Sequence, residues 1–128
     1  MRSVLIVDDD PAMIVILKVI LEENEFEVIG TASNGQEAIN IFKSYSSKPD
    51  FIFMDYRMPI KHGIDATVEI LKVDKTARII IISGDIEVRE RAFRSGAQGF
   101  IKKPFTIENI LNKIEKLDII QKNQKVMA

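Results

Sequence analysis

Apolar residues gather in short, nearly unbroken runs that recur along the chain. The runs cover residues 3–7, 26–30, 51–54, 78–82 and 99–101. A strand with one face in water alternates apolar and polar side chains, whereas a strand covered on both faces is apolar throughout. These runs therefore predict the buried strands of a parallel sheet.

Each run is followed by a longer segment in which apolar residues recur with helical spacing. Asp10 and Pro11 mark the start of the first helix as its N-cap and first helical residue, and Asn34 precedes the second. The fourth helix is expected over residues 86–95, ending at Gly96, and Thr106 caps the last. The side chains expected to face the sheet are Met13, Ile16, Leu17, Ile20 and Asn24; Ala38, Ile41, Phe42 and Tyr45; Ile64, Val68 and Leu71; and Ile107, Ile110, Leu111 and Ile114.

The alternation of strand and helix predicts an α/β fold, an open and mostly parallel sheet with helices on both faces. A chain of 128 residues is long enough for one core and too short for two of ordinary size, so we expect a single domain over residues 1–128. No linker or repeat interrupts the pattern, and only the polar residues 122–128 are expected to fray.

Polar side chains stand at the ends of these strands, where ligands bind in such a fold. They are Asp8, Asp9 and Asp10 after the first strand, Asp55 after the third, Ser83 after the fourth, and Lys102, Lys103 and Pro104 after the fifth. Any one of them alone is an ordinary cap or turn residue. Because all of them are expected at one edge of the sheet, together they favour a reactive site there.

Carboxylates crowded together resist ionisation unless a cation offsets their charge, and Mg²⁺ prefers one or two carboxylates together with phosphate oxygens. A carboxylate cluster beside a hydroxyl and an ammonium therefore predicts phosphoryl transfer. Asp55 is the expected nucleophile, forming an acyl phosphate. Asp8 and Asp9 are the expected metal ligands, while Ser83 and Lys103 are expected to bind phosphoryl oxygens.

Composition narrows the possible partners. The formal net charge is −1, with 29% charged and 46% hydrophobic residues, so no strong field favours nucleic acid or a membrane surface. The chain has no cysteine, which excludes disulfides and thiolate metal sites. The amino terminus does not look like a signal peptide, because "SVLIV" is followed at once by three aspartates. We therefore expect a cytoplasmic protein.

The motifs "VLIVDDDP", "MDYRMP", "IIISGD" and "GFIKKPF", in this order, resemble the receiver domain of two-component response regulators over essentially the whole chain. The resemblance implies a flavodoxin-like, doubly wound sheet with strand order 2-1-3-4-5. It also implies that Asp55 accepts the phosphoryl group, that the carbonyl of Arg57 joins the Mg²⁺ ligands, and that Ser83 and Phe100 form a switch. A cis bond between Lys103 and Pro104 is expected as well.

The resemblance further implies a sensor histidine kinase or histidine phosphotransfer protein as phosphodonor, and a downstream effector protein read by the fourth helix, fifth strand and fifth helix. Such a receiver phosphorylates itself and is not a turnover enzyme. We expect a receiver domain over residues 1–128 without an output domain, as a monomer or a weak, phosphorylation-linked dimer. An apolar cluster of Ile14, Val15 and Val19 on the outer side of the first helix is the expected docking surface for the donor. Arg57 and Asp85 are expected to interact over the site and to modulate the lifetime of the acyl phosphate.

Three alternatives compete with this interpretation. A phosphatase resembling haloacid dehalogenases places its nucleophile after the first strand, and a flavodoxin-like FMN carrier has a phosphate loop rich in Ser, Thr and Gly. The third is a receiver-like binding module that works without phosphorylation. His62, in a polar turn with no visible partner, is not expected to be a phosphohistidine or a metal ligand. The arginines of the fourth helix, Arg89, Arg91 and Arg94, favour a solvated or protein-binding face over a DNA-binding one.

Overall fold

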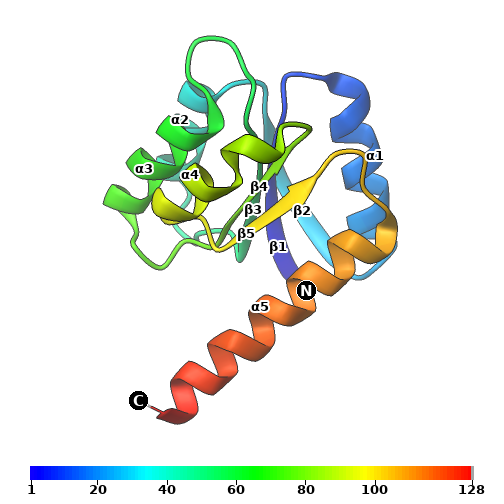
Figure 1. Ribbon diagram of the computed structural model, residues 1–128, viewed down its shortest axis with the longest axis vertical. Coiled ribbons are helices and arrows are strands. Elements are labelled where there is room, and N and C mark those ends of the chain that lie inside the picture. Colours follow the sequence, from blue (N-terminus) through cyan, green and yellow to red (C-terminus); the bar gives the residue numbers. More distant parts are fainter. Residues whose placement is uncertain (128) are drawn as a thin grey trace.

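The structure is a computed structural model that describes residues 1–127. A sheet of parallel strands forms its centre, in the order β2-β1-β3-β4-β5 (Figure 1). The strands are β1 (Arg2–Val7), β2 (Phe26–Ala32), β3 (Phe51–Asp55), β4 (Ile79–Ser83) and β5 (Gly99–Lys102). Both the fold class and the strand order are as expected.

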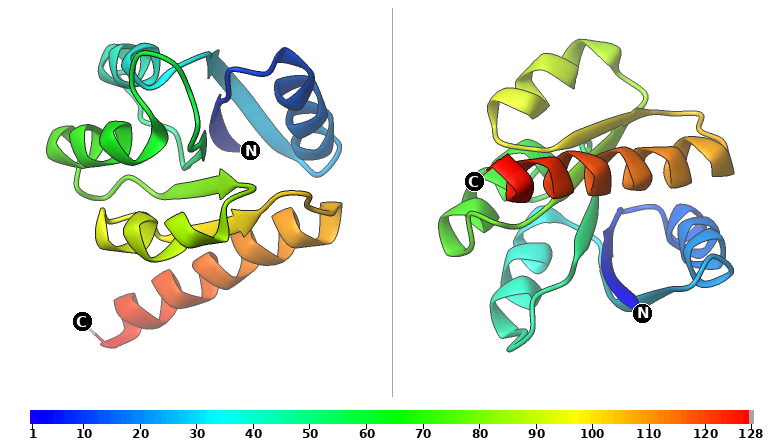
Figure 2. Two further views of the ribbon diagram at one scale, coloured as in Figure 1. Left: turned by 45° about the horizontal axis from the view of Figure 1, so that its top comes forward. Right: turned by 90° about the horizontal axis from the view of Figure 1, so that it is seen from below.

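Helices cover both faces of this sheet (Figure 2). They are α1 (Pro11–Glu22), α2 (Gly35–Ser44), α3 (Gly63–Val73), α4 (Arg89–Arg94) and α5 (Ile107–Met127), with a short 3₁₀ turn, η1 (Ile86–Val88), before α4. Helices α1 and α5 pack on one face, and α2, α3 and α4 on the other. Within residues 1–127, none of these helices combines the length and the apolarity needed to cross a bilayer.

Strands β3 and β4 are fully buried, and apolar up to their last residue, because each serves two cores. Successive side chains of a strand point to opposite faces of the sheet. In β4, Ile79 and Ile81 therefore join the core under α2, α3 and α4, whereas Ile80 and Ile82 join the core under α1 and α5. All of these side chains are almost completely removed from water.

The helix boundaries follow the expected local signals. The side chain of Asp10 accepts a hydrogen bond of 3.0 Å from the backbone N–H of Ala12, and Pro11 opens α1. Gly96 follows α4 with a φ of +106°, a left-handed conformation that glycine adopts without steric cost. The fourth helical segment is divided, however, because residues 86–88 form a 3₁₀ turn and only Arg89–Arg94 are α-helical.

The expected inner faces of three helices are partly wrong. In α3 the side chain of Val68 is 37% exposed, whereas Thr67 and Ile70 are buried. In α1, Ile16 is 47% exposed and Ile14 is half-buried against the core under α1 and α5. In α5, Ile107 is exposed while Ile110 and Ile114 are buried as expected.

Helix α5 contradicts the expectation of a frayed tail. It continues to Met127, and Ala128 lies outside the described residues. Its second half extends beyond the edge of the sheet (Figure 1). Near its middle, Asp118 forms ion pairs with Arg2 of β1 and with Arg78, just before β4, and so fixes the helix to the amino-terminal edge of the sheet.

Candidate functional site

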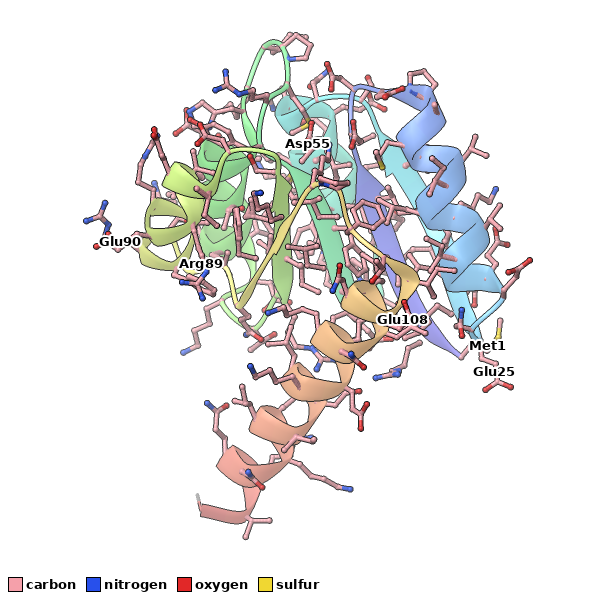
Figure 3. The ribbon with its side chains drawn as sticks, turned by 45° about the vertical axis from the view of Figure 1, so that its right-hand side comes forward. Met1, Glu25, Asp55, Arg89, Glu90 and Glu108 are labelled. Carbon is pink, nitrogen blue, oxygen red and sulfur yellow. The ribbon has the colours of Figure 1, made fainter. Side chains whose placement is uncertain are left out.

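Four polar side chains lie at the edge of the sheet where β1, β3, β4 and β5 end. Asp8 follows β1 directly, Asp55 and Ser83 are the last residues of β3 and β4, and Lys103 follows β5. The strands end together because their registers are aligned: Asp55 pairs with Ile82, and Ser83 pairs with Lys102. Asp55 lies at this edge in Figure 3. The sequence thus predicted which residues the sheet brings together.

Lys103 links two of the carboxylates. Its Nζ donates to Oδ1 of Asp55 at 2.9 Å and to Oδ2 of Asp8 at 3.3 Å. The other oxygen of Asp8 accepts a bond of 2.9 Å from the backbone N–H of Asp10, which orients that carboxylate. The peptide bond between Lys103 and Pro104 is cis, as expected. Oδ2 of Asp55 is left without a hydrogen bond among the described residues, which makes it the oxygen of Asp55 that is open to a reaction partner.

The carboxylates of Asp8 and Asp55 are almost completely buried. Asp8 is 2% and Asp55 is 7% exposed. Burial raises the pKa of Asp55, and the negative charges of Asp8 and Asp9 raise it further, although the hydrogen bond and the charge of Lys103 oppose them. Burial would lower the pKa of Lys103, but its contacts with Asp55 and Asp8 outweigh burial, so that the pKa of Lys103 is raised. Lys103 therefore stays charged, but its single positive charge does not balance the negative charges of Asp8, Asp9 and Asp55.

The carboxylates of Asp8, Asp9 and Asp55 each offer an oxygen, and these oxygens lie within 4.8 Å of one another. Asp8 and Asp55 are buried and Asp9 is exposed. An all-oxygen donor set open to water on one side is the environment that Mg²⁺ prefers, since this ion keeps several of its waters. The residues present therefore fit a Mg²⁺ ion.

The two expected switch residues occupy defined positions. The hydroxyl oxygen of Ser83 accepts a bond of 3.0 Å from the backbone N–H of Asp85, and the side chain is 3% exposed. Phe100 points inward, into the core under α2, α3 and α4. Both side chains are thus held within the protein in this structure.

Arg57 and Asp85 meet across the mouth of the site, as expected. Nη2 of Arg57 lies 3.3 Å from Oδ2 of Asp85, so the ion pair joins the loop after β3 to the loop after β4. Arg57 also lines a hollow of about 380 Å³ beside the acidic cluster, together with Asp9, Tyr56 and His62. The pair of Arg57 and Asp85 therefore lies beside the acidic cluster.

Sequence reasoning missed the role of the Tyr56 and His62 side chains. Nδ1 of His62 accepts a bond of 3.3 Å from the backbone N–H of Asp65, so His62 caps α3 and has the partner that the sequence did not reveal. Its ring lies 5.2 Å from that of Tyr56, and the Tyr56 hydroxyl accepts a bond of 3.2 Å from Arg91 of α4. Histidine is an uncommon cap, so the sequence carried no clear signal.

The expected docking surface on α1 needs one correction. Val15 and Val19 are exposed, at 59% and 49%, but Ile14 is half-buried against the core. Ile16 takes its place on the outer side of the helix. The exposed apolar cluster of α1 consists of Val15, Ile16 and Val19.

Comparison with known proteins agrees with this geometry. Residues 4–115 match the family model described as "Response regulator receiver domain". The chain belongs to the response regulator receiver family. As a receiver, it is a domain of the kind used in two-component signalling, and its carboxylate cluster coincides with the acidic site that the motifs predicted.

Its relatives include chemotaxis regulators. The receiver is 43% identical over 115 residues to the chemotaxis protein CheY of Halobacterium salinarum, covering 88% of this chain and 93% of the relative. It is 42% identical over 120 residues to the chemotaxis protein CheY of Thermotoga maritima, covering 90% and 98%.

Solved structures confirm the fold. A CheX–CheY–BeF₃–Mg²⁺ complex from Borrelia burgdorferi superimposes with a TM-score of 0.86 at 32% identity, covering 91% of this receiver and 88% of that chain. The response regulator TrrA of Thermotoga maritima, in complex with Mg²⁺ and BeF, gives a TM-score of 0.82 at 32% identity, covering 91% and 99%.

Proposed function

We propose that this receiver accepts a phosphoryl group from a phosphohistidine partner on Asp55, with Mg²⁺, and that the acyl phosphate switches a protein-binding surface. The observation that carries the proposal is the placement of Asp55: a buried carboxylate with one oxygen bonded to Lys103 and the other open, inside a cluster of carboxylates. An aspartate that served only to end a strand or to cap a turn would need neither the bond to Lys103 nor the neighbouring carboxylates.

The chemistry follows from the free oxygen. Oδ2 of Asp55 attacks phosphorus, a P–O bond forms, and the P–N bond to the donor imidazole breaks, with its electron pair leaving on nitrogen. Lys103, already bonded to Oδ1, stays fully protonated and is placed to pair with a phosphoryl oxygen. Ser83 supplies a hydroxyl donor at the end of the neighbouring strand. The strand ends thus position the reacting groups before the donor arrives.

Asp8, Asp9 and the backbone carbonyl of Arg57 are the groups that would hold Mg²⁺. When bound, the ion offsets the negative charge of the carboxylates and of the phosphoryl oxygens. Asp8 is preoriented for this role by the N–H of Asp10 and by Lys103. Asp9, exposed at the mouth, adds a ligand without the cost of burying a further charge.

The switch is proposed to run through Ser83 and Phe100. A phosphoryl group on Asp55 offers the Ser83 hydroxyl a charged acceptor, which competes with its present bond to the N–H of Asp85. A shift of Ser83 at the end of β4 changes the space beside β5, from which Phe100 projects. Phosphorylation would then alter the population of inward Phe100, and the surface of α4, β5 and α5 with it.

The test is intact mass after incubation with acetyl phosphate, with and without Mg²⁺. We expect a gain of one phosphoryl group for the wild type with Mg²⁺ and none for Asp55→Asn. Asp10→Asn is the matched control: it removes a neighbouring carboxylate while asparagine still caps α1, so it should be phosphorylated normally. A wild type that gains no mass with acetyl phosphate or with a phosphorylated kinase would instead indicate a phosphorylation-independent binding module.

We also propose that the exposed cluster Val15, Ile16 and Val19 on α1 docks the phosphodonor, a sensor histidine kinase or histidine phosphotransfer protein. The variant Val15→Ser/Val19→Ser should slow transfer from the phosphorylated partner and leave phosphorylation by acetyl phosphate unchanged. Equal transfer rates for variant and wild type would contradict this assignment.

A further inference from the structure

We propose that Arg91 of α4 is a positioning residue for the Mg²⁺ site. It holds the side chain of Tyr56, which directly follows Asp55, and so fixes the loop in which the carbonyl of Arg57 is proposed to bind the ion. The affinity for Mg²⁺ then depends on the position of α4. The inference deepens the proposed function and rests on its Mg²⁺ site, but it requires no phosphorylation.

The three arginines of α4 make different contacts. Arg89 and Arg94 each contact a side chain of their own helix. Arg91 instead reaches a residue 35 positions away in the chain: its Nη1 donates to the Tyr56 hydroxyl at 3.2 Å, and its guanidinium lies 5.7 Å from the centre of the Tyr56 ring. A hydrogen bond and a cation–aromatic contact therefore connect α4 to the loop after β3.

The Tyr56 side chain also contacts the start of α3. The centre of its ring lies 5.2 Å from that of His62, which caps α3 by accepting a bond from the N–H of Asp65. The same ring packs against the core under α2, α3 and α4, so the side chain is half-buried. It lines the hollow beside Asp9 as well. Arg91 thus acts on an aromatic ring that lies next to the acidic cluster.

The backbone after Tyr56 is held less firmly than Tyr56 itself. The N–H of Tyr56 donates to the carbonyl of Ile82 at 3.2 Å, and its carbonyl accepts a bond of 2.9 Å from the N–H of Gly63. For Arg57 and Met58, no backbone hydrogen bond is present within residues 1–127. The Arg57 carbonyl is therefore free to bind a cation, and its position depends on the contacts of the neighbouring side chains.

Two such side-chain contacts reach the loop from residues 85–91. Asp85 lies 3.3 Å from the guanidinium of Arg57, and Arg91 bonds to the hydroxyl of Tyr56 at 3.2 Å. The two contacts hold adjacent residues of the loop, so a displacement of α4 moves or releases the proposed ligand. Because coupling between two sites is reciprocal, Mg²⁺ binding should in turn restrain α4.

A purely electrostatic role of Arg91 predicts the opposite effect on Mg²⁺ affinity. A nearby positive charge repels Mg²⁺, so removal of the guanidinium should strengthen binding if charge alone matters. A positioning role predicts weaker binding. Tyr56→Phe adds an independent test, because it removes the hydroxyl that accepts the bond and changes no charge. The sign of the change in affinity therefore separates the two explanations.

The experiment is a titration of the protein with Mg²⁺, followed by the ¹H–¹⁵N chemical shift of the Asp10 amide, which donates to Asp8. The variants are Arg91→Ala, Tyr56→Phe and the two substitutions together. Arg94→Ala is the matched control, because it removes the same charge from the same helix. The Tm of each protein without Mg²⁺ distinguishes a loss of stability from a loss of affinity.

We expect each single variant to raise the Kd for Mg²⁺ about two- to fivefold, the effect of losing one hydrogen bond. The double variant should raise the Kd no further than the larger single effect, because both substitutions break the same contact. Arg94→Ala should not raise it. In the wild type, Mg²⁺ should slow amide exchange in residues 89–94, and this effect should be smaller in Tyr56→Phe.

An unchanged or lower Kd in Arg91→Ala or in Tyr56→Phe would overturn the inference and leave the Mg²⁺ site standing. So would additive effects in the double variant. A lower Tm with an unchanged Kd would show that the contact between Arg91 and Tyr56 only stabilises the fold. A wild type that binds no Mg²⁺ would overturn the proposed site and the inference together.

Discussion

The two edges of the sheet hold opposite arrangements of charge. At the carboxyl-terminal edge, the carboxylates of Asp8, Asp9 and Asp55 gather around one ammonium group, that of Lys103. At the amino-terminal edge, the carboxylate of Asp118 lies between two guanidinium groups, those of Arg2 and Arg78, and the carboxylate of Asp50 accepts a hydrogen bond from the backbone N–H of Ser3. One edge therefore carries excess negative charge, whereas the charges named at the other edge are balanced.

The charges at the two edges also differ in how the protein compensates them. The guanidinium of Arg78 lies 4.0 Å from the centre of the Phe51 ring, and that of Arg2 lies 4.7 Å from the centre of the Phe26 ring. Aromatic faces attract cations, so the protein satisfies its own arginines. Among the residues that the structure describes, the ion pairs of Asp8 and Asp55 at the other edge are formed by Lys103 alone. The charges of the amino-terminal edge are therefore compensated within the protein. The negative charge of the carboxyl-terminal edge is compensated only in part, which leaves a place for an added cation.

The largest effect is expected when Lys103, which forms the ion pairs of Asp8 and Asp55 within residues 1–127, is replaced. Lys103→Met leaves two buried carboxylates unpaired, which should cost about 2 kcal/mol and lower Tm by roughly 6–10 °C at neutral pH. Differential scanning calorimetry would measure this, and added Mg²⁺ should restore much of the loss. Lys102→Met is the control, because Lys102 is exposed and forms no ion pair among the described residues; a Tm equally low in this variant would contradict the explanation.

A smaller loss is expected at the opposite edge. Asp118→Asn leaves Arg78, whose side chain is only 11% exposed, without its carboxylate. We expect a loss of about 1–2 kcal/mol in the free energy of unfolding, measured by urea denaturation, with an unchanged dependence on Mg²⁺. Glu22→Gln, which breaks an exposed pair with Lys18, should change stability by less than about 0.5 kcal/mol. A Mg²⁺ dependence altered by Asp118→Asn would show that the two edges are not independent.

Replacing Asp55 should have the opposite sign. Its pKa is raised by burial, so the ionised form is less favourable in the folded than in the unfolded protein. Asp55→Asn should therefore raise Tm by roughly 3–5 °C without Mg²⁺, the equivalent of about 1 kcal/mol. This advantage should be full above the folded pKa of Asp55 and should vanish below its unfolded pKa of about 3.9. An advantage that grew on acidification would refute the argument.

The smallest effect concerns the exposed pair of Arg57 and Asp85 over the site. We propose that it limits access of water to the acyl phosphate. An exposed pair contributes about 0.2–1 kcal/mol, so Arg57→Ala should shorten the phosphoryl lifetime by about 1.4- to 5-fold. The decay of phosphorylated mass after removal of acetyl phosphate measures this. Arg94→Ala, which breaks a pair with Glu90 away from the site, should leave the lifetime unchanged.

The sequence predicted the carboxyl-terminal edge almost completely. Strands β3 and β4 are continuous apolar runs, and the polar residue that ends each of them, Asp55 or Ser83, marks both the boundary and the site. Parallel strands then bring these ends together without further information. The positions of these residues could be predicted because the signal that ends each strand also marks the polar residue at its end.

The amino-terminal edge carried no such signal. Arg2 and Asp118 are 116 residues apart, and nothing in either segment distinguishes them from other surface charges. Helix faces were mistaken for a related reason. In α3, fully buried Thr67 donates its hydroxyl to the carbonyl of Gly63 at 2.8 Å, while the more hydrophobic Val68 faces water. Close packing of small residues decided that face, and hydrophobicity alone does not report it.

At the polar end of α5 the prediction failed in another way, because fraying was expected where the structure has a helix. Residues 122–126 contain no apolar stripe, and composition therefore suggested fraying. They contain no glycine or proline either, and Lys and Gln favour helix intrinsically. The helix consequently continues past the point at which packing ends.

Asp118 lies near the middle of α5 and is held by Arg2 and Arg78. These two ion pairs make α5 a lever whose pivot is at Asp118. Residues 107–117 form one arm, beside β5 and the site, and residues 119–127 form the other, beyond the sheet (Figure 1). At 1.5 Å per residue the arms measure roughly 16 Å and 13 Å. A displacement of α5 near Lys103 would therefore move its far end in the opposite direction and by nearly the same distance. The distance between two spin labels, one at that far end, would record this movement.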